Sequence, residues 1–364
     1  MSKKKKNKKG LIFKSFTGII TALIISVVAC VFFLSKPVDT NEEIVPFEVV
    51  EGASYNSVGS DLKEQGFIKS ELYYKYCLKS ADTSNLYVGK YPISTSMTVE
   101  EILAVISSGE TYFPDGYLVT FREGKTMTQY AEIIAENSAH TVDEVYALLK
   151  DEAYLDELIS TYWFITEEIK NPEIYYPLEG YLYPETYMFT DANMPIKEIF
   201  AMMLNQTESV LEEYKPDIES SGYTVHEILT LASIIEQEAG SSSDRAGVAG
   251  VFYNRLNDGW SLGSDVTTYY GVQVHMSERD LFMDELEEAN AYNTRHESMA
   301  GKLPIGPVCN SSSSAIIACI NPTISEYYYF VADKNGTTYF NTNEYDHAET
   351  VQKLQDEGLW YTYE

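Results

Sequence analysis

The chain has 364 residues, 45% of them hydrophobic, so it is long enough for two or three globular domains with a sizeable core. Its formal net charge of −29 excludes the basic surface that binding to nucleic acid requires. The charge is unevenly distributed, because residues 1–36 hold eight lysines and no acid, which leaves 18 basic against 55 acidic residues in the remainder. We therefore predict a strongly acidic globular part behind a basic N-terminal segment.

An uncharged apolar run from Ser15 to Ser35 follows the basic N-terminus. As a helix, these residues rise about 31 Å, which matches the roughly 30 Å hydrocarbon core of a bilayer. Lysines supply six of the first nine residues, so the positive-inside rule keeps the N-terminus in the cytoplasm. We predict a cytoplasmic tail at residues 1–14, a single-pass transmembrane helix at 15–35, and an extracytoplasmic remainder held at the cell membrane.

A cleaved signal peptide and a lipidated cysteine are the two alternatives to a membrane anchor. A cleaved signal peptide has a shorter apolar region that ends in small residues, which is not the pattern found here. The stretch Val27–Cys30 resembles the lipobox at which bacterial lipoproteins are cut and lipidated on the cysteine. Because the apolar run continues to Leu34, beyond Cys30, the sequence favours the spanning helix.

The cysteines and histidines indicate neither a disulfide framework nor a metal site. Beyond the apolar run only Cys77, Cys309 and Cys319 remain, and a bond between the last two is left open. His226 and Glu227 begin like a zinc-binding helix, but Thr230 stands where the second histidine ligand is required. No cofactor is predicted.

A short linker at residues 36–43 leads into a small α+β unit, which we place at residues 44–110. Phe47–Val50 alternates like a strand, and Val88–Ile93 resembles a turn. Helices are predicted at 57–65, at 71–79 and from the Thr98–Glu101 capping box to Gly109.

Residues 111–364 form the larger predicted domain, which is mixed α+β. The pattern predicts a strand at 118–121, helices at 127–137, 141–158 and 196–214, and a strand at 327–332 with a hairpin turn at Asn335–Gly336. Residues 171–190 are rich in proline and tyrosine, and three prolines interrupt any helix there. This stretch is therefore predicted to be a structured loop.

The helix predicted at residues 224–239 is the most informative element. Thr224 and Glu227 form a capping box at its start, and Gly240 suits its end. On a helical wheel Glu236 falls within the apolar arc, whereas Glu238 falls beside Glu227 toward the polar side. Glu236 is therefore the preferred candidate for a buried functional carboxyl.

A carboxyl on an apolar stripe is disfavoured when ionised, so it retains a proton that it can donate near neutral pH. The alternative is a structural glutamate that pairs with an arginine, such as Arg245 or Arg255. A buried ion pair is a costly way to stabilise a fold, so a functional glutamate is slightly favoured over a structural one. Both interpretations stay open.

Six motifs follow one another in the acidic part of the chain. They are Leu178–Tyr187, Leu231–Ala239, Val248–Leu256, Ala291–Thr294, Leu303–Pro307 and Tyr329–Ala332. Their order and spacing resemble those of the YceG-like (MltG) family of endolytic murein transglycosylases over roughly residues 44–364. The resemblance implies a LysM-like subdomain at 44–110 and a catalytic domain at 111–364.

The resemblance also implies a reaction. One catalytic glutamate, which matches Glu236, protonates the oxygen between N-acetylmuramic acid and N-acetylglucosamine (MurNAc and GlcNAc) and then deprotonates the muramyl 6-hydroxyl, which closes a 1,6-anhydro ring. Ordinary glycosidases need a second carboxylate, whereas here the sugar's own hydroxyl attacks. One carboxyl is therefore enough, and neither metal nor cofactor is needed.

Further substrate-binding residues are implied by motif alone, and each could instead be a packing residue. They are Glu179, Tyr181, Glu185, Asn254, Asp265, Tyr292 and Asn293. The chain departs from the family pattern at three places, with Val266 for a proline, Ser311-Ser312 for Pro-Gly, and Arg295 for an aromatic residue. These departures bear on loop shape and substrate detail.

The function predicted from the sequence is therefore an endolytic lytic transglycosylase that acts on nascent peptidoglycan strands and terminates their elongation, beside membrane peptidoglycan synthases. One alternative is a non-catalytic peptidoglycan-binding or scaffold protein. Another is a hydrolase that uses water, for which Glu238 or Glu185 would supply the second carboxylate.

Overall fold

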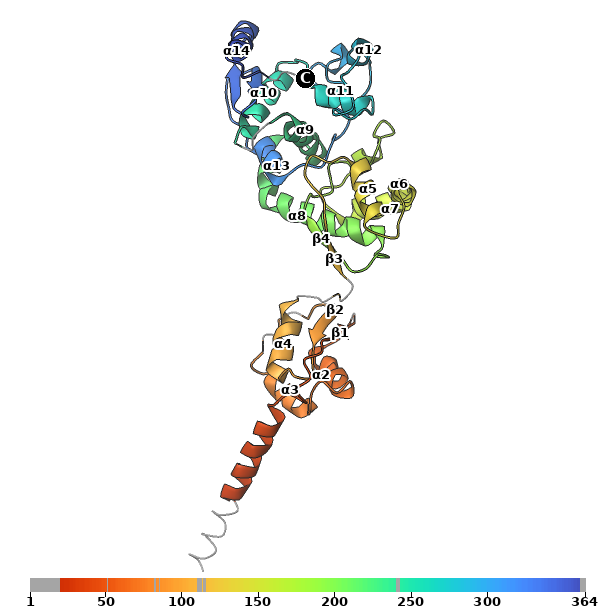
Figure 1. Cartoon of the computed structure of the whole chain (residues 1–364), viewed down its shortest axis with the longest axis vertical. Helices are drawn as coiled ribbons and strands as arrows, with labels where there is room; N and C mark the ends of the chain where they lie inside the picture. Colours follow the sequence, from red (N-terminus) through yellow and green to blue (C-terminus); the bar gives the residue numbers. More distant parts are fainter. Residues whose placement is uncertain are drawn as a thin grey trace, which may run out of the picture. The chain divides into compact units, whose positions relative to one another are not determined.

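The chain folds into two units, which Figure 1 draws in the colours of the sequence. The computed structural model describes residues 20–50, 52–81, 83–84, 86–109, 113, 116–239 and 243–360. Clustering of contacts divides the chain between Gly116 and Tyr117, whereas the sequence-based boundary was placed between residues 110 and 111. Each unit has its own hydrophobic core and is described by itself.

The N-terminal end of the described chain is helical over residues 20–34, and most of its apolar side chains are exposed (Figure 1). The predicted basic tail and the first residues of the predicted transmembrane segment lie outside the described residues. Within the part of the chain that is described, we find no helix with both the length and the apolar character needed to cross a membrane.

The small unit has the element order strand, helix, helix, strand, helix. These elements are β1 (Val45–Val49), α2 (Tyr55–Glu64), α3 (Glu71–Cys77), β2 (Gly89–Ile93) and α4 (Val99–Ser108). The strands pair antiparallel with Phe47 opposite Tyr91, and both side chains are fully buried. The prediction of a turn at Val88–Ile93 is therefore wrong, because this segment pairs with β1 and contributes to the core.

Helix α4 confirms the capping signals found in the sequence. The Thr98 hydroxyl accepts a hydrogen bond from the Glu101 amide, and Glu101 Oε2 accepts one from the Thr98 amide at 2.7 Å. Gly109 ends the helix with φ of +75°, a left-handed conformation that glycine adopts without steric cost.

The first half of the large unit contains the strand pair β3–β4 and three short helices. The elements are β3 (Tyr117–Thr120), α5 (Met127–Glu136), α6 (Val142–Leu149), α7 (Glu152–Thr161), the 3₁₀ turn η1 (Glu167–Lys170) and β4 (Thr186–Phe189). The single helix predicted at 141–158 is two, because Asp151 caps the start of α7. The loop predicted at 171–190 ends in β4, which pairs antiparallel with β3.

The second half of the large unit is mostly helical. Its elements are α8 (Ile196–Ser221), α9 (Val225–Glu238), α10 (Arg245–Asn257), α11 (Asp265–Gly271), α12 (Met283–Leu286), the 3₁₀ turn η2 (Glu297–Met299), α13 (Ser313–Ile320), β5 (Tyr329–Ala332), β6 (Thr338–Asn341) and α14 (Glu344–Asp356). Helix α8 was predicted to end at residue 214 but continues through Pro216, because Ile218 beyond it is buried in the core. The predicted hairpin at Asn335–Gly336 is confirmed by the pairing of β5 with β6.

Helix α9 lies at the centre of the large unit, with α10, α11 and α13 packed against it (Figure 1). Its predicted start is confirmed, because the Thr224 hydroxyl accepts from the Glu227 amide at 3.2 Å and the Glu227 carboxylate accepts from the Thr224 amide at 2.8 Å. Gly240, the predicted terminator, lies outside the described residues. Ten of the fourteen residues of α9 are buried, so helices cover more than one face of it.

Two glycines share one backbone conformation but differ in the space around them, so substitutions at both measure how closely the loop before β4 approaches its neighbours. Gly180 and Gly222 both have φ of +81°, but a Cβ atom at Gly180 would lie 2.3 Å from Pro307 Cβ, whereas one at Gly222 would meet nothing within 4 Å. We expect Gly222→Ala to lower the free energy of unfolding by about 1 kcal/mol through backbone strain. Gly180→Ala should lower it by about 2–4 kcal/mol, since overpacking adds to the strain. Urea unfolding of both variants measures the difference, and equal losses would contradict the close approach.

Candidate active site

The C-terminal turn of α9 carries two carboxyl groups, Glu236 and Glu238, that face different surroundings. Glu236 Oε1 lies 2.6 Å from Arg245 Nη2 at the start of α10. Glu236 Oε2 accepts hydrogen bonds from the Ser312 amide at 2.9 Å and from the Ser312 hydroxyl at 2.6 Å. The Glu236 side chain is only 5% exposed and that of Arg245 only 12%. Glu236 is therefore a buried carboxylate with three charge-assisted or polar contacts.

These contacts hold the Glu236 carboxyl in one orientation. Ser312 is the N-cap of α13, so the carboxyl also lies at the positive end of a helix dipole. The expectation that Glu236 stands alone on an apolar face is therefore wrong, and the arginine-paired interpretation describes its surroundings.

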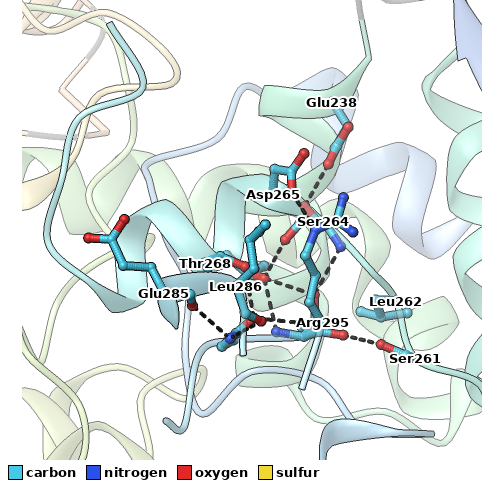
Figure 2. A network of polar contacts seen from close by, with 12 residues as sticks. Glu238, Ser261, Leu262, Ser264, Asp265, Thr268, Glu285, Leu286 and Arg295 are labelled. Atoms are coloured by element: carbon cyan, nitrogen blue, oxygen red, sulfur yellow. Dashed lines mark hydrogen bonds and ion pairs between the residues drawn. The ribbon is translucent and has the colours of Figure 1, made fainter. Parts of the chain in front are cut away.

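Glu238 points the other way, into a cavity of about 840 Å³. Its Oε1 accepts a hydrogen bond from the Ser264 hydroxyl at 2.6 Å, as Figure 2 shows. The helical wheel had placed Glu238 toward the polar side of α9, but burial of its carboxyl raises the pKa above the ordinary value. The polar side of the wheel is not exposed at Glu238, because the segment around Ser264 and helix α11 cover this side of α9.

The polar and charged groups around Glu238 shift its pKa in opposite directions. After burial, the Ser264 hydrogen bond is the largest influence and lowers the pKa, Asp265 raises it, and Arg295 and Arg255 lower it. Arg295 is itself paired with Asp265 through its Nε atom (Figure 2). Burial outweighs the other influences, so Glu238 retains its proton to higher pH than an exposed glutamate does.

Segments far apart in the sequence line this cavity. Besides Glu238 they supply Gln237, Phe252, Arg255, Leu262, Gly263, Ser264, Asp265, Val266, Tyr269, Met276, Asp280, Leu281, Leu286, Arg295, Phe330 and His347. Gln237 is fixed by a hydrogen bond from its side-chain amide to the Gly124 carbonyl at 2.6 Å. The volume lies within the usual range for sites that bind small ligands or part of a polymer.

A second cavity, of about 860 Å³, lies at the other end of α9, around Tyr223, His226 and Lys302. His226 lines it but is engaged, because its ring nitrogens bond the Tyr181 hydroxyl and the Ile305 carbonyl, both at 2.8 Å. The cavity beside Glu238 lies at the end of α9 that also carries Glu236, and burial raises the pKa of the Glu238 carboxyl that lines it.

Three of the residues implied by motif lie in the core instead of on the cavity wall. Tyr181 and Tyr292 are 1% exposed and Asn293 is fully buried. Asn293 donates to the carbonyls of residues 285, 286 and 288 and accepts from the Thr268 hydroxyl, so it holds the loop before Arg295 in place. In this structure these side chains support the site from behind and do not reach a ligand.

Of the other residues implied by motif, one ties two segments together, one is exposed at the surface and one lines the cavity. Asn254 donates to the carbonyls of Ser325 and Tyr327, both at 2.9 Å, and so ties α10 to the segment before β5. Glu185 is exposed at the start of β4. Only Asp265 reaches the cavity, together with Ser264 and His347, which the sequence had not singled out.

Glu179 is a buried carboxyl that joins three segments. Both of its oxygens lie 2.9 Å from the Met127 amide at the start of α5, and Oε2 accepts from the Tyr270 hydroxyl of α11 at 3.0 Å. The Asn310 amide lies 3.5 Å from Oε1. Burial raises the pKa of Glu179 to about 8, so the carboxyl is protonated at neutral pH.

The described residues contain no group of three or more His, Cys, Asp or Glu side chains arranged to hold a metal ion. The bond between Cys309 and Cys319, left open by the sequence, is absent, because both thiols are free and buried.

Comparisons with known proteins agree with one another. A sequence model of the YceG-like family matches residues 47–353. An endolytic murein transglycosylase of Bacillus subtilis (strain 168) is 34% identical over 322 residues, which is 88% of each chain. Another, of Streptococcus pneumoniae serotype 2 (strain D39 / NCTC 7466), is 31% identical over 332 residues, which cover 86% of this chain and 59% of that one. The crystal structure of a yceG-like protein from Listeria monocytogenes superposes with a TM-score of 0.60 at 30% identity, over 85% of this chain and all of that one.

The pKa of Glu179 predicts a pH dependence of stability. The unfolded chain releases this proton near pH 4.5, whereas the folded protein keeps it to about pH 8. The stabilisation is therefore complete below pH 4.5 and is lost as the pH rises to about 8, by at most about 5 kcal/mol at 1.36 kcal/mol per pKa unit. Glu179→Gln should remove this dependence, and urea unfolding between pH 5 and 8.5 measures it. The exposed Glu185→Gln serves as control, and parallel pH curves for wild type and Glu179→Gln would contradict the assignment.

Proposed function

The chain belongs to the YceG-like family, and from this premise we propose that it is an endolytic lytic transglycosylase that cuts peptidoglycan strands between MurNAc and GlcNAc and leaves 1,6-anhydroMurNAc ends. The observation that supports this chemistry is the carboxyl of Glu236 at the end of α9, which is only 5% exposed and is held by Arg245 and by the Ser312 hydroxyl. Termination of nascent strands beside membrane synthases belongs to the same proposal.

The reaction needs one group that first gives and then takes a proton. The protonated carboxyl donates to the glycosidic oxygen as the bond from that oxygen to the muramyl C1 breaks. The resulting carboxylate accepts the proton of the muramyl 6-hydroxyl, whose oxygen forms the new bond to C1. The carboxyl is thereby regenerated and no water is consumed, so a second catalytic carboxylate is unnecessary.

We propose Glu236 for this role, because it matches the one catalytic glutamate of the family. Its Oε1 lies 2.6 Å from Arg245 Nη2, and its Oε2 accepts from the Ser312 hydroxyl at 2.6 Å, so the carboxyl is held in one orientation. Glu238, which lines the cavity and whose pKa is raised by burial, is the alternative, and the two roles can be tested against each other.

The contacts of Glu236 join the end of α9 to the starts of α10 and α13. The small unit, with its strand–helix–helix–strand order, is proposed to be LysM-like and to position the catalytic unit on its substrate.

Paired substitutions test the assignment. Glu236→Gln should reduce the release of anhydro-ended fragments from purified glycan strands by at least about 100-fold, because the amide cannot transfer the proton. Glu238→Gln, a matched change on the same turn of α9, should retain more activity. Mass spectrometry of the products measures both activities, and thermal melting shows whether each variant is folded, since Arg245 loses its counter-charge in Glu236→Gln.

Each remaining outcome points to another interpretation. Loss of activity in a folded Glu238→Gln protein, with Glu236→Gln active, would assign the acid to Glu238. Fragments with reducing ends, heavier than anhydro ends by one water, would indicate a hydrolase. Wild-type protein that binds strands and releases nothing would favour the scaffold alternative.

We further propose that residues 15–35 span the cell membrane with residues 1–14 in the cytoplasm. The support comes from the flanking lysines and from the exposed apolar side chains of the helical residues 20–34. Such an anchor would keep the enzyme near strands that are still being made.

Membranes that contain the full chain test this topology. Protease added to intact spheroplasts should digest the part beyond residue 36 and spare a tag placed before Met1, because the bilayer protects the cytoplasmic side. Permeabilised spheroplasts, in which the tag is also lost, are the control. A mature protein that lacks the N-terminal lysines and starts at a lipidated Cys30 would overturn the proposal.

A further inference from the structure

The helix formed by residues 20–34 ends directly against the small unit. Leu34 packs against the hydrophobic core of that unit. The Lys69 ammonium donates to the Phe33 carbonyl at 3.2 Å and lies 4.3 Å from the centre of the Phe33 ring. Lys69 immediately precedes Ser70, the N-cap of α3, so the start of α3 lies beside the end of this helix (Figure 1).

The segment that follows this helix is also attached to the small unit. The Asp39 amide donates to the Thr95 carbonyl at 3.2 Å, and the Thr95 hydroxyl donates to Asp39 Oδ1 at 2.6 Å. Only residues 35–38 separate these contacts from Leu34. The small unit is therefore held next to the end of the helix and does not hang from a long free linker.

Helix α3 presents two large apolar side chains to solvent. Leu72 is 82% exposed and Tyr76 is 65% exposed, and residues four apart lie on the same face of a helix. The opposite face carries Tyr73, Tyr74 and Cys77, which are buried in the core of the small unit. The outward face of α3 thus lacks the polar character that a surface helix ordinarily shows toward water.

The charge around this face is the opposite of that in the rest of the exported part of the chain. Residues 63–79 hold four lysines and two glutamates, whereas residues 37–364 as a whole hold 18 basic and 55 acidic residues. Lys75 lies three residues after Leu72 on the same side of α3, and Lys79 follows in the turn after the helix. Both lysines are exposed, and Glu71 pairs with Lys75 at 2.6 Å.

A face that is both apolar and basic, beside the end of a membrane helix, fits the surface of a bilayer. Tyrosine and leucine side chains enter the boundary between headgroups and acyl chains, where the tyrosine hydroxyl still meets water. Lysine stems lie along apolar surface while their ammonium groups reach lipid phosphates. Anionic lipids repel the acidic remainder of the chain, so charge also selects which side of the small unit faces the membrane.

We propose that α3 lies on the outer surface of the cell membrane, with Leu72 and Tyr76 inserted at the level of the headgroups. Lys75 and Lys79 pair there with the phosphates of anionic phospholipids. The inference rests on the spanning helix of the proposed function and gives the small unit a second contact with the bilayer. With two contacts, the small unit keeps one orientation on the membrane and does not turn about the axis of its anchor.

Spin labels on the full chain in lipid vesicles test this contact. A nitroxide on Tyr76→Cys, with Cys30→Ser because the other cysteines are buried, reports its accessibility to oxygen, which enters lipid, and to a nickel chelate, which stays in water. The vesicles contain phosphatidylcholine and phosphatidylglycerol. We expect the ratio of oxygen to nickel accessibility to be several-fold higher at residue 76 than at Glu48→Cys, an exposed position on β1.

Removal of charge tests the part played by the anionic lipid. Lys75→Gln combined with Lys79→Gln should lower the ratio at residue 76 to the value found in vesicles of phosphatidylcholine alone, because the attraction to phosphate is lost. Lys150→Gln combined with Lys353→Gln removes the same charge from exposed positions of the large unit and should leave the ratio unchanged. Thermal melting shows that both combinations are folded.

Two results would overturn the inference while leaving the anchor intact. One is an equal ratio at residues 76 and 48 in a chain that stays in the vesicles. The other is spin–spin broadening at residue 76 with a ratio that does not depend on lipid, which would indicate contact with a second copy of the chain. If alkaline carbonate released the chain from the vesicles, the spanning helix would fail. A high ratio at residue 76 before that release would still support the contact of α3, and a low one would overturn both.

Discussion

The contact of Glu236 with Arg245 and Ser312 is the constraint on which the site depends. It joins the C-terminal turn of α9 to the first residue of α10 and to the N-cap of α13. A buried ion pair contributes little net stability, because desolvation of both charges offsets their attraction. It does impose a geometry, since any other arrangement would leave a buried charge unpaired. The turn of α9 that carries Glu238 is thereby held in one orientation.

The helical period then separates the two carboxyls. Residues two apart on a helix lie about 200° apart around its axis, so Glu236 and Glu238 cannot share one environment. Glu236 meets Arg245 and the N-terminus of α13, whereas Glu238 meets Ser264 and lines a cavity, and burial raises the pKa of Glu238. The same turn thus places two carboxyls in two different surroundings.

The cavity wall is assembled from the later parts of the chain. The segment around Ser264, the loop that carries Arg295, the strand β5 and the helix α14 all reach it. The buried residues implied by motif serve this assembly: Asn293 holds the loop before Arg295, and Glu179 links α11 to the start of α5. A site of this kind needs to exclude water and to hold a sugar in register, and walls from several segments achieve both.

Local signals in the sequence determined much of the fold. The capping boxes at Thr98 and Thr224 and the Asn335–Gly336 hairpin depend on contacts within a few residues, so pattern alone found them. The strands β2 and β4 were missed, since a short strand depends on a partner that lies elsewhere in the chain. The family followed from ordered motifs, and the candidate helix from its caps and apolar residues.

Only the tertiary structure showed what surrounds each of the two glutamates. A helical wheel assumes one buried and one solvent-facing side, but α10, α11 and α13 cover several sides of α9, so the polar side of the wheel is also buried. Ser312 lies 76 residues from Glu236 in the sequence, and Ser264 lies 26 residues from Glu238. Partners at such separations set the charge of a carboxyl, and their positions follow from packing and not from local pattern.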